Sequence, residues 1–542
     1  MLIEKSAYCR LAAVVGLFGF WITAVWADAV VDPASRLQED VRRAESVRPV
    51  PAPAWQAPAA KPLQLPDGPV LKGKIFLQEV LFSPSQLLSD KQLGDLVRPY
   101  VGRSVGSDEL NALLRDIQAL YLALGVQSAV PVVPPQDLQT GVIKILLVEG
   151  TLGQVKFAGS TKPDPAWLAQ WFDMTPGQVI RPEPLARRLD VFNASSDFMA
   201  DGQYVAGQSF GTSDLEVNVP ELATTQFWAM SELPGVGSGR TLGNSLIMGF
   251  RHYPVSSVGG RLDGMVIQGP STTTLSLSGG LPIGHQGWRL GANTAVSRSR
   301  QWMQAAENFE YLREGAATSF GVDVTRHVVV APGQLWRISA GLTSFRSQSV
   351  FLSENNRSTL QKATLAAATD WLVHPGLGQE RGSLRASLNT AKGQANSFSY
   401  AEIYSALAYR VAGPQGPVLR GNVQWRLLDK HSPDISDLWM AGGSASVRGF
   451  DPGAVYGRSG HAMQVALYQP LPWKSVDTPE AFVFVDQARA VKDSLSNRIG
   501  STGLGVQFQM DRRWAIETAL THQTHGFQGP RTRLLLKASV AW

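Results

Sequence analysis

Two short patterns in the 542-residue chain contain residue types that serve as nucleophiles or metal ligands in enzymes. Residues 207–211 read Gly-Gln-Ser-Phe-Gly, the pattern of a nucleophilic serine on a sharp turn, which requires a strand that runs into a helix. The strand-like segment 214–219 follows instead, so we interpret the pattern as a hairpin turn. His522 and His525 could bind a metal, but without a third ligand beside them they are better explained as a pair on a loop or rim.

Nucleotide and nucleic-acid binding are not indicated either. Gly235, Gly237 and Gly239 miss the dinucleotide-binding spacing because residue 240 is arginine. The chain has 49 Lys and Arg against 44 Asp and Glu, and this net charge of +5 is too dilute for a nucleic-acid surface. We therefore expect no enzymatic activity, no cofactor, no metal and no nucleic-acid partner.

Residues 1–27 have the pattern of a secretory signal peptide. Lys5 and Arg10 precede an apolar run over residues 11–25. A single-pass anchor is the alternative, but the run is shorter than the ~20 residues that a spanning helix needs. Cys9 is the only cysteine and would be removed with this segment, so the mature chain is expected to have no disulfide and no thiol chemistry. The chain is predicted to be exported.

Residues 28–48 are predicted to form a short helix, and residues 49–70 a proline-rich linker. Asp32 could cap the helix, and Pro33 suits its first turn. Its apolar stripe is thin, which favours a polar environment over a packed core. The linker contains seven prolines, and such a composition gives an extended, semi-rigid spacer.

Residues 71–149 and 150–220 are predicted to form two copies of one α+β unit, in the order strand–helix–helix–strand–strand. In the first copy Ser107 is a candidate helix cap, and Gly125 a candidate helix stop. The segments expected in the first copy are 74–82, 85–97, 107–124, 128–133 and 142–148. Those expected in the second copy are 152–158, 165–172, 184–193, 204–207 and 214–219.

From residue 221 to residue 542 the chain alternates apolar and polar residues in segments of about ten. Leu419, Val423 and Trp425, for example, oppose Arg420 and Asn422. At about 20 residues per strand and connection, this region gives about 16 strands. A soluble antiparallel sandwich would also alternate. The aromatic strand ends, the lack of accompanying helices and the low charged fraction of 17% favour a closed membrane barrel.

Three groups of short motifs occur in a fixed order along the chain. They are Gln136-Asp137-Leu138 with Gly141 and Val148-Glu149-Gly150; Ala441-Gly442-Gly443 with Val447-Arg448-Gly449-Phe450; and Phe484-Val485-Asp486. In this order and spacing they resemble the outer-membrane transporters of two-partner secretion, of the haemolysin secretion/activation type. The resemblance covers the mature chain. It implies a plug helix, a linker, two α+β polypeptide-transport-associated (POTRA) units in the periplasm, and an all-β, 16-stranded antiparallel transmembrane barrel.

The resemblance also implies roles for single residues. Val447, Arg448, Gly449 and Phe450 would form the tip of a loop that folds back into the barrel. Asp486, with Phe484, would receive Arg448 on the wall, although an exposed loop arginine is the alternative. The terminal Trp542 would act as a membrane-insertion signal. The junction between the two POTRA units would comprise Gln136, Asp137, Leu138, Gly141, Glu149 and Gly150.

The function that this resemblance implies is export of one large partner protein, such as an adhesin or a haemolysin, to the cell surface or medium. The POTRA units would bind the unfolded partner by strand addition, for which residues 128–133 are a candidate edge, unless they only support the barrel. Outer-membrane lipid, the barrel-assembly machinery and periplasmic chaperones are further expected partners. An insertase of other barrels is the first alternative, and the plug helix with only two units argues against it. A solute porin is the second, but it would not need a periplasmic array.

Overall fold

The computed structural model places most of the chain. It describes residues 32–46 and 73–542 apart from 127, 138–139, 210, 222–223, 238–239, 242–243, 307–308, 332–333, 352–353, 373–380, 395, 412, 414–415, 429–434, 473–476, 493–494, 511–512 and 528. The predicted signal peptide and proline-rich linker lie outside the described residues. No helix within the described ranges is long and apolar enough to span a membrane.

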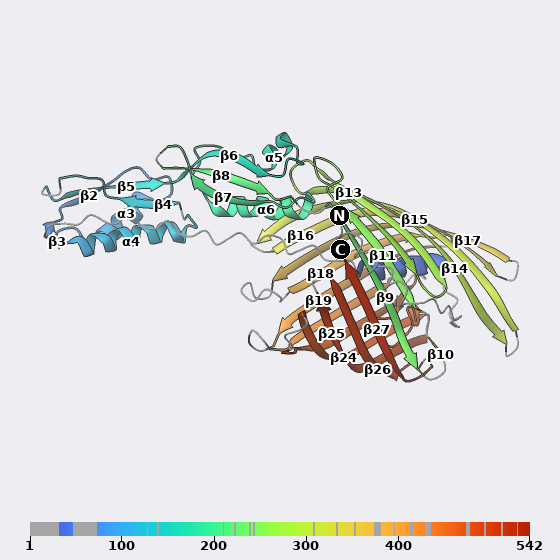
Figure 1. Cartoon of the computed structure of the whole chain (residues 1–542). Helices are drawn as coiled ribbons and strands as arrows, with labels where there is room; N and C mark the ends of the chain where they lie inside the picture. Colours follow the sequence, from blue (N-terminus) through green and yellow to red (C-terminus); the bar gives the residue numbers. More distant parts are fainter. Residues whose placement is uncertain are drawn as a thin grey trace, which may run out of the picture.

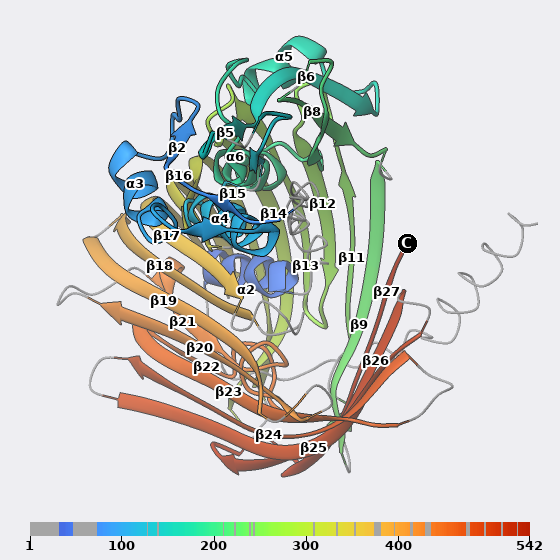
Figure 2. The ribbon, with the colours of Figure 1, turned by 90° about the vertical axis from the view of Figure 1, so that its left-hand side faces the viewer.

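Two α+β units lie in a row and join one end of a closed barrel (Figure 1). We call the end of the barrel that carries the second unit the near end, and the opposite end the far end. The barrel surrounds helix α2 (Pro33–Ser46), as the second view shows (Figure 2).

The first unit packs two helices on a three-stranded sheet. Tyr121 and Ile117 of the longer helix are fully buried against Ile143 and Ile145 of the central strand. The sheet has the order β2-β5-β4. Its elements are β1 (Ile75–Phe76), β2 (Glu79–Phe82), α3 (Asp90–Val97), β3 (Ser104–Val105), α4 (Ser107–Ala123), β4 (Ala129–Val132) and β5 (Val142–Glu149).

Three boundaries in this unit differ from the prediction. The expected strand 74–82 is two strands, because β1 pairs with β3 whereas β2 pairs with β5. The helix expected from residue 85 begins at Asp90, where Ser89 and Gln92 form a capping box. Ser107 is the first helical residue and not the cap. Gly106 is the cap residue, and its N–H donates to the Glu109 carboxylate at 2.9 Å.

The second unit repeats the arrangement with an aromatic core. Trp167, Trp171, Phe172 and Phe192 are buried together beneath the sheet, whose order is β6-β8-β7. The residues of the serine pattern join β7 to β8, and the Gly207 N–H donates to the Thr212 carbonyl at 3.0 Å, so this segment is a hairpin turn. The elements are β6 (Thr151–Gly159), α5 (Pro165–Trp171), α6 (Pro182–Ser195), β7 (Asp201–Ala206) and β8 (Thr212–Val219).

Sixteen antiparallel strands form the wall of the barrel, which closes where β27 pairs with β9. The two-residue β10 (Arg240–Thr241) only extends the β9 hairpin. The wall strands are β9 (Thr225–Gly237), β11 (Ser245–His252), β12 (Arg261–Gln268), β13 (Thr272–Ile283), β14 (Trp288–Ala306), β15 (Phe309–Ala331), β16 (Gln334–Phe351), β17 (Glu354–Leu372), β18 (Arg381–Lys392), β19 (Ser397–Arg410), β20 (Val418–Leu428), β23 (Ser459–Pro470), β24 (Asp477–Lys492), β25 (Leu495–Met510), β26 (Trp514–His525) and β27 (Thr532–Ala541).

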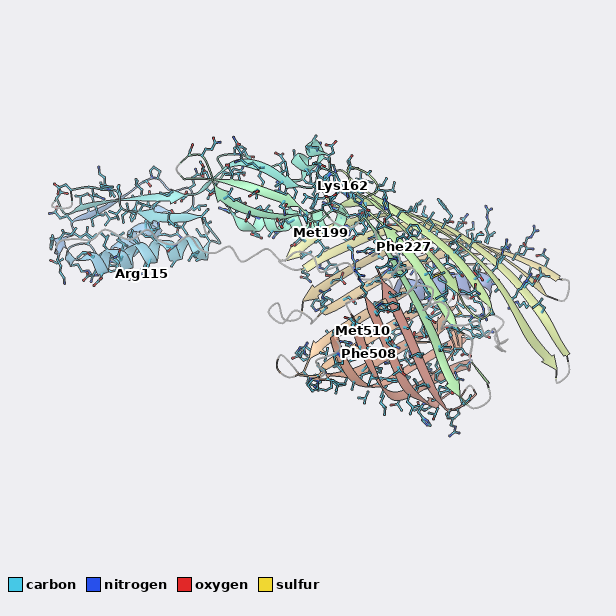
Figure 3. All side chains as sticks on the ribbon, in the orientation of Figure 1. Arg115, Lys162, Met199, Phe227, Phe508 and Met510 are labelled. Carbon is cyan, nitrogen blue, oxygen red and sulfur yellow. The ribbon has the colours of Figure 1, made fainter. Side chains whose placement is uncertain are left out.

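The alternation in the sequence separates an apolar outer surface from a polar lumen. Leu342, Leu365 and Leu388 are each more than half exposed on the outside of the wall. On β25, Phe508 and Met510 share the outer face with Leu504, and their side chains are labelled in Figure 3. Closure satisfies the strand N–H and C=O groups without exposing an edge, which is what a wall surrounded by lipid requires.

The second unit is fixed to the near end by polar contacts. Asp197 forms an ion pair with Arg289 at 2.6 Å, and the guanidinium also donates to the Ser195 carbonyl. The Gly260 N–H donates to the Ser196 carbonyl at 3.3 Å, and a Cβ on Gly259 would lie only 1.9 Å from that oxygen. The second unit therefore approaches the barrel at a point where only glycine fits.

Candidate functional site

Helix α2 lies inside the barrel, and its first turn is fixed to the wall. The Asp32 carboxylate accepts the Ala34 N–H at 2.8 Å and the Ser347 hydroxyl at 3.2 Å. Pro33 is the first helical residue, where its missing N–H costs nothing. The expected helix over 28–48 is thus placed at Pro33–Ser46, with Asp32 at its cap.

The apolar contact of α2 with the wall is small. Ala34 and Leu37 are the buried apolar residues that the helix contributes, and Val41 is partly buried beside them. They pack on wall residues that share the inner face of β14–β19: Ala295, Ala317, Phe345, Leu360, Ala391, Phe398 and Tyr400.

Polar side chains make the remaining contacts between α2 and the wall. The Lys362 ammonium donates to Gln38 Oε1 at 2.7 Å, and the Thr274 hydroxyl donates to Asp40 Oδ2 at 3.1 Å. Arg42 donates to the side-chain oxygen of Gln424. Such exchangeable hydrogen bonds hold a helix in a water-containing lumen less firmly than apolar burial would.

A second segment also enters the lumen. The lumen loop, residues 435–458, connects β20 to β23 and contains η1 (Ile435–Asp437), β21 (Trp439–Ala441) and β22 (Val455–Gly457). It contacts α2 directly. The Leu438 N–H donates to the Ser35 hydroxyl at 3.0 Å, and the Gln38 amide donates to the Ser436 carbonyl at 3.0 Å. The helix α2 is therefore held between the wall and the lumen loop.

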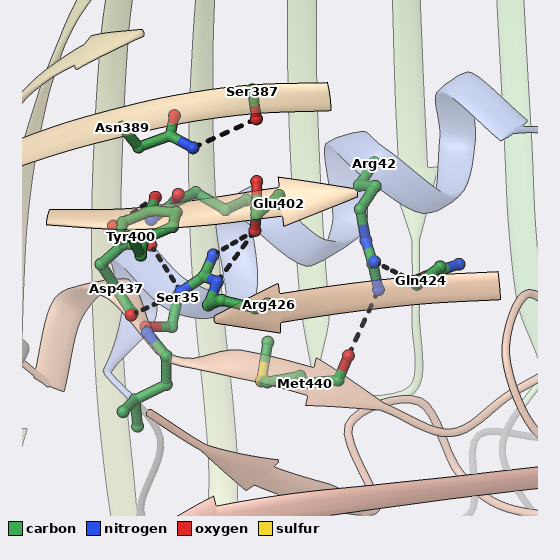
Figure 4. Close-up of polar contacts among 12 residues, drawn as sticks. Ser35, Arg42, Ser387, Asn389, Tyr400, Glu402, Gln424, Arg426, Asp437 and Met440 are labelled. Carbon is green, nitrogen blue, oxygen red and sulfur yellow. Dashed lines mark hydrogen bonds and ion pairs between the residues drawn. The ribbon is translucent and has the colours of Figure 1, made fainter. Parts of the chain in front are cut away.

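One buried cluster fixes the first part of the lumen loop to the wall (Figure 4). Arg426 on β20 donates to Glu402 at 2.8 Å and to the Asp437 carbonyl at 2.9 Å, and its guanidinium lies 4.2 Å from the Tyr400 ring. The Tyr400 hydroxyl donates to Asp437 at 2.7 Å. Sequence reasoning missed this cluster. Alternation put Arg426 on the lumen face, but its partners follow only from the register of β19 and β20.

The tip of the lumen loop is fixed to the wall by Arg448 and Asp486. Arg448 donates through Nε and a terminal nitrogen to the two oxygens of Asp486, both at 2.8 Å, and its backbone N–H donates at 3.0 Å. The Arg448 side chain is 7% exposed and that of Asp486 is fully buried. The guanidinium also lies 3.8 Å from the centre of the Phe484 ring. The structure thus brings together the three residues that the resemblance paired.

The neighbours of Arg448 account for the shape of the tip. Gly449 has a φ of +81°, and a Cβ there would lie 2.5 Å from the Thr521 hydroxyl. Its carbonyl accepts the Gln523 amide at 2.8 Å. Val447 and Phe450 are completely buried in a cluster with wall alanines. The tip therefore has one conformation, fixed by a backbone turn and an ion pair.

We predict that Asp486→Asn lowers the free energy of unfolding by about 3 kcal/mol, because it leaves the buried Arg448 guanidinium without its counter-charge. The measurement is the urea midpoint of the barrel, followed by the different gel mobilities of its folded and unfolded forms. Asp370→Asn is the matched control. It removes the same group from an Arg337 pair of 2.7 Å that is about half exposed, and should cost less than about 1 kcal/mol. Equal midpoints for the two variants would contradict the prediction.

We also predict that Ser35→Ala with Gln38→Ala increases the open fraction of the channel in a planar bilayer about tenfold. The pair loses three hydrogen bonds to the loop and to Lys362, each contributing about 0.5–1.5 kcal/mol. Asn422→Ala is the control, since among the described residues this amide bonds Gln464 on the wall at 2.8 Å and makes no hydrogen bond to α2. A control variant that opens as often as the double variant would show that α2 is not what closes the channel.

Trp542 completes the seam between the first and last strands. Its N–H donates to the Phe227 carbonyl at 2.9 Å, and the Phe227 N–H donates back at 2.8 Å. The two rings stack with centroids 5.9 Å apart. The terminal residue therefore adds one more pair to the β27–β9 ladder at the near end.

The residues expected at the junction between the two units do not all lie there. Glu149 and Gly150 connect β5 directly to β6, whereas Gln136, Asp137 and Gly141 lie at the other end of β5. Because β5 is eight residues long, about 26 Å separates the two groups. The assignment of all six residues to the junction is therefore wrong for these three, and Leu138 lies outside the described residues.

Both groups have structural contacts that account for their residue types. The Gln136 amide bonds the Lys144 backbone in both directions at 2.7 Å, which fixes the β4–β5 loop. Gly141 has a φ of +73°, and a Cβ there would clash with the Phe76 carbonyl. The Glu149 carboxylate accepts the Tyr121 hydroxyl at 2.9 Å, and burial raises the pKa of Tyr121, so it stays a donor.

The free sheet edges of the two units differ in how many N–H groups they offer. In the first unit the Gly150 N–H donates to the Ser128 carbonyl. Because hydrogen-bonded and non-bonded pairs alternate along an antiparallel ladder, the backbone nitrogens of Ala129 and Pro131 on β4 point away from β5. Proline has no N–H, which leaves one donor on that edge. In the second unit the Gly207 N–H donates to Thr212, and the same alternation makes the backbone N–H groups of Gly202, Tyr204 and Ala206 on β7 point away from β8. Within the described residues none of these three N–H groups has a partner on the free side.

The two candidate metal ligands contact threonine side chains. His522 contacts the Thr532 hydroxyl, and His525 contacts that of Thr524. No group of three or more His, Cys, Asp or Glu residues suited to a metal ion occurs in the described part of the chain.

Comparison with known proteins supports the assignment of the fold. A family model described as "POTRA domain, ShlB-type" matches residues 75–150. The heme/hemopexin transporter protein HuxB of Haemophilus influenzae (strain 86-028NP) is 21% identical over 483 residues, which is 83% of each chain. The outer membrane transporter CdiB of Dickeya dadantii is 22% identical over 291 residues, 52% of this chain and 50% of CdiB.

A solved structure shows the same architecture. CdiB from Escherichia coli covers 95% of this chain and 100% of its own, with a TM-score of 0.67 and 13% identity. The predicted fold class, α+β units followed by a 16-stranded antiparallel barrel, is confirmed.

Proposed function

We propose that this chain is an outer-membrane transporter of two-partner secretion, which exports one large partner protein through its barrel. The barrel lies in the outer membrane with the POTRA units in the periplasm. Its near end is then the periplasmic end, and its far end opens to the cell exterior. The partner enters unfolded and folds outside. Because the periplasm offers no ATP, that folding supplies the energy of export.

The observation that carries the proposal is the way in which the lumen is filled. Among the described side chains of α2, residues 33–42, only Ala34 and Leu37 are buried in the apolar cluster with the wall. Its contacts with the wall and the lumen loop include hydrogen bonds to Thr274, Lys362 and Leu438. A helix held in this way can leave without exposing a large apolar surface. A partner chain could then occupy the lumen, whose polar side chains suit an extended, hydrated polypeptide.

The relatives favour transport over the two alternatives and over enzymatic activity. HuxB and CdiB are named as transporters, and the match to HuxB extends over most of the chain. A solute porin would leave the two POTRA units without a use. An insertase would need no helix that closes its lumen. We therefore propose that the chain is not an enzyme and needs no cofactor.

The direct test is secretion by cells that carry or lack this gene. Deletion should remove one large protein from the culture medium while the other outer-membrane barrels remain at normal abundance. A joint loss of many barrels from the membrane would instead identify an insertase. A loss of small-solute uptake with an unchanged medium would identify a porin.

We further propose that the free edge of β7 accepts the partner as an added strand. It presents three N–H groups on Gly202, Tyr204 and Ala206, whereas Pro131 leaves the first unit's β4 with one. The expectation that residues 128–133 provide the edge is thus less well supported. Main-chain bonds to an edge suit an unfolded partner, because they do not depend on its sequence.

Gly202→Pro should reduce secretion of the partner at least fivefold, since it removes an outward N–H while the bonds of β7 to β8 remain. The readout is the amount of partner in the medium relative to the periplasm. Gly202→Ala is the matched control, because its Cβ would make ordinary contacts at 3.4 Å with the side chains of Leu185 and Leu189, and it should secrete normally. Equal secretion by the two variants would exclude β7 as the binding edge.

For its own assembly, we propose that the barrel depends on periplasmic chaperones and the barrel-assembly machinery, with Trp542 as the signal. The stacked pair of Trp542 and Phe227 at the seam supports this, since an aromatic terminus that completes the last strand is exposed until the barrel closes.

A further inference from the structure

Four cationic side chains lie on the outer surface of the barrel near its far end. The inner face of β14–β18 is identified by the residues that contact α2, and strand alternation assigns their neighbours to the outer face. Ala295, Phe345, Leu360 and Ala391 lie inside. Arg298, Arg346, Arg357 and Lys392 therefore lie outside, and we call these four residues the basic patch.

The strand register brings the four residues together. Arg298 pairs with Ala316, Ala316 with Gln348, and Gln348 with Arg357, so that Arg298 and Arg357 lie in one row. Arg346 precedes Gln348 by two residues on the middle strand. Lys392 pairs with Gln361, four residues along β17 from Arg357. At ~4.8 Å between strands and ~3.3 Å per residue, the patch spans about 19 Å across the five strands and about 13 Å along them.

The charge of the basic patch is not compensated. All four side chains are exposed, and none has an ion pair or hydrogen bond among the described residues. The nearby Arg300 differs, because Glu314 on the next strand pairs with it at 2.8 Å. The patch is therefore a concentrated positive surface on a wall that is otherwise apolar.

An apolar depression lies directly below the basic patch on the outer wall. It has a volume of about 520 Å³, and its lining includes Leu290, Val322, Leu342, Leu365 and Leu388. Leu342 precedes Arg346 by four residues, and Leu388 precedes Lys392 by four, so about 13 Å separates depression from patch along a strand. The patch lies on the exterior side, because Arg298 and Arg346 lie in the second halves of β14 and β16, which lead from the end beside the POTRA units to the far end (Figure 1).

We propose that this surface binds one phosphorylated glycolipid of the outer leaflet, with its phosphates on the basic patch and an acyl chain in the depression. Unpaired guanidinium groups suit phosphate, which accepts two parallel hydrogen bonds from each. A lipid fits this arrangement. Its charged group lies at the membrane surface, level with the basic patch, and its acyl chains point toward the membrane centre, where the depression lies. The proposal rests on the outer-membrane location and not on the identity of the exported partner.

The test is a titration of the purified full-length barrel with diphosphoryl lipid A, read by native mass spectrometry. A variant with all four patch residues changed to glutamine should bind at least tenfold more weakly, because each cation beside an anionic lipid contributes about fivefold. Lipid A stripped of phosphate should bind the two proteins equally. Gel mobility of the folded form verifies that the variant has folded.

Two further proteins separate a specific site from general charge. The control changes four exposed POTRA cations to glutamine: Lys91, Arg115, Lys144 and Arg181. It should bind lipid A within twofold of the unchanged protein. The charge-preserving variant R298K/R346K/R357K loses the paired guanidinium hydrogen bonds and should bind more weakly than the unchanged protein but more tightly than the glutamine variant.

Unchanged binding by the glutamine patch variant would overturn the proposal. An equal loss of lipid A binding in the POTRA control would also overturn it. So would mass spectra in which the unchanged protein forms a dimer without bound lipid and the patch variant loses that dimer. A failure of the secretion test would leave this result unaffected, since lipid binding is measured without a partner protein.

Discussion

A closed sixteen-stranded wall imposes the main constraint on this protein: whatever fills its lumen must be held by polar contacts. The inner faces of the strands carry side chains such as Arg426, Asp486 and Lys362, because the outer faces are committed to lipid. An apolar plug would leave these groups buried without partners. The lumen is filled instead by α2 and by the lumen loop, both of which satisfy the wall with charges and hydrogen bonds.

The two lumen segments are held with very different strength. The lumen loop is fixed at its start and at its tip by buried clusters, in which the guanidinium groups of Arg426 and Arg448 bond Asp437 and Asp486. Helix α2 has single hydrogen bonds and a contact formed by Ala34 and Leu37. Removing one partner of a buried pair costs about 3–5 kcal/mol, and a single hydrogen bond about 1 kcal/mol. On the proposed function, α2 leaves first, while the loop stays in place.

Much of this arrangement could be predicted from the sequence, and the rest fails for identifiable reasons. Alternation revealed the barrel and the lumen face of Arg426, because a strand repeats every two residues. It could not identify Glu402 or Asp437 as partners, since the register of β19 against β20 and the path of the loop depend on tertiary structure. The motif order pointed to Arg448 and Asp486. The same motif match misplaced Gln136, Asp137 and Gly141, because a match to a motif does not show that the eight-residue β5 separates them from Glu149 and Gly150.

The central claim is that α2 must leave the lumen before a partner can pass, and a disulfide tests it directly. A Cβ on Gly315 would lie 3.4 Å from the Cβ of Pro33, close to the ~3.8 Å that disulfides adopt. Secretion of the partner by the Pro33→Cys/Gly315→Cys chain should stop under oxidising conditions and return on reduction, while each single-cysteine chain secretes throughout. Export at an unchanged rate with the cross-link intact would contradict the account.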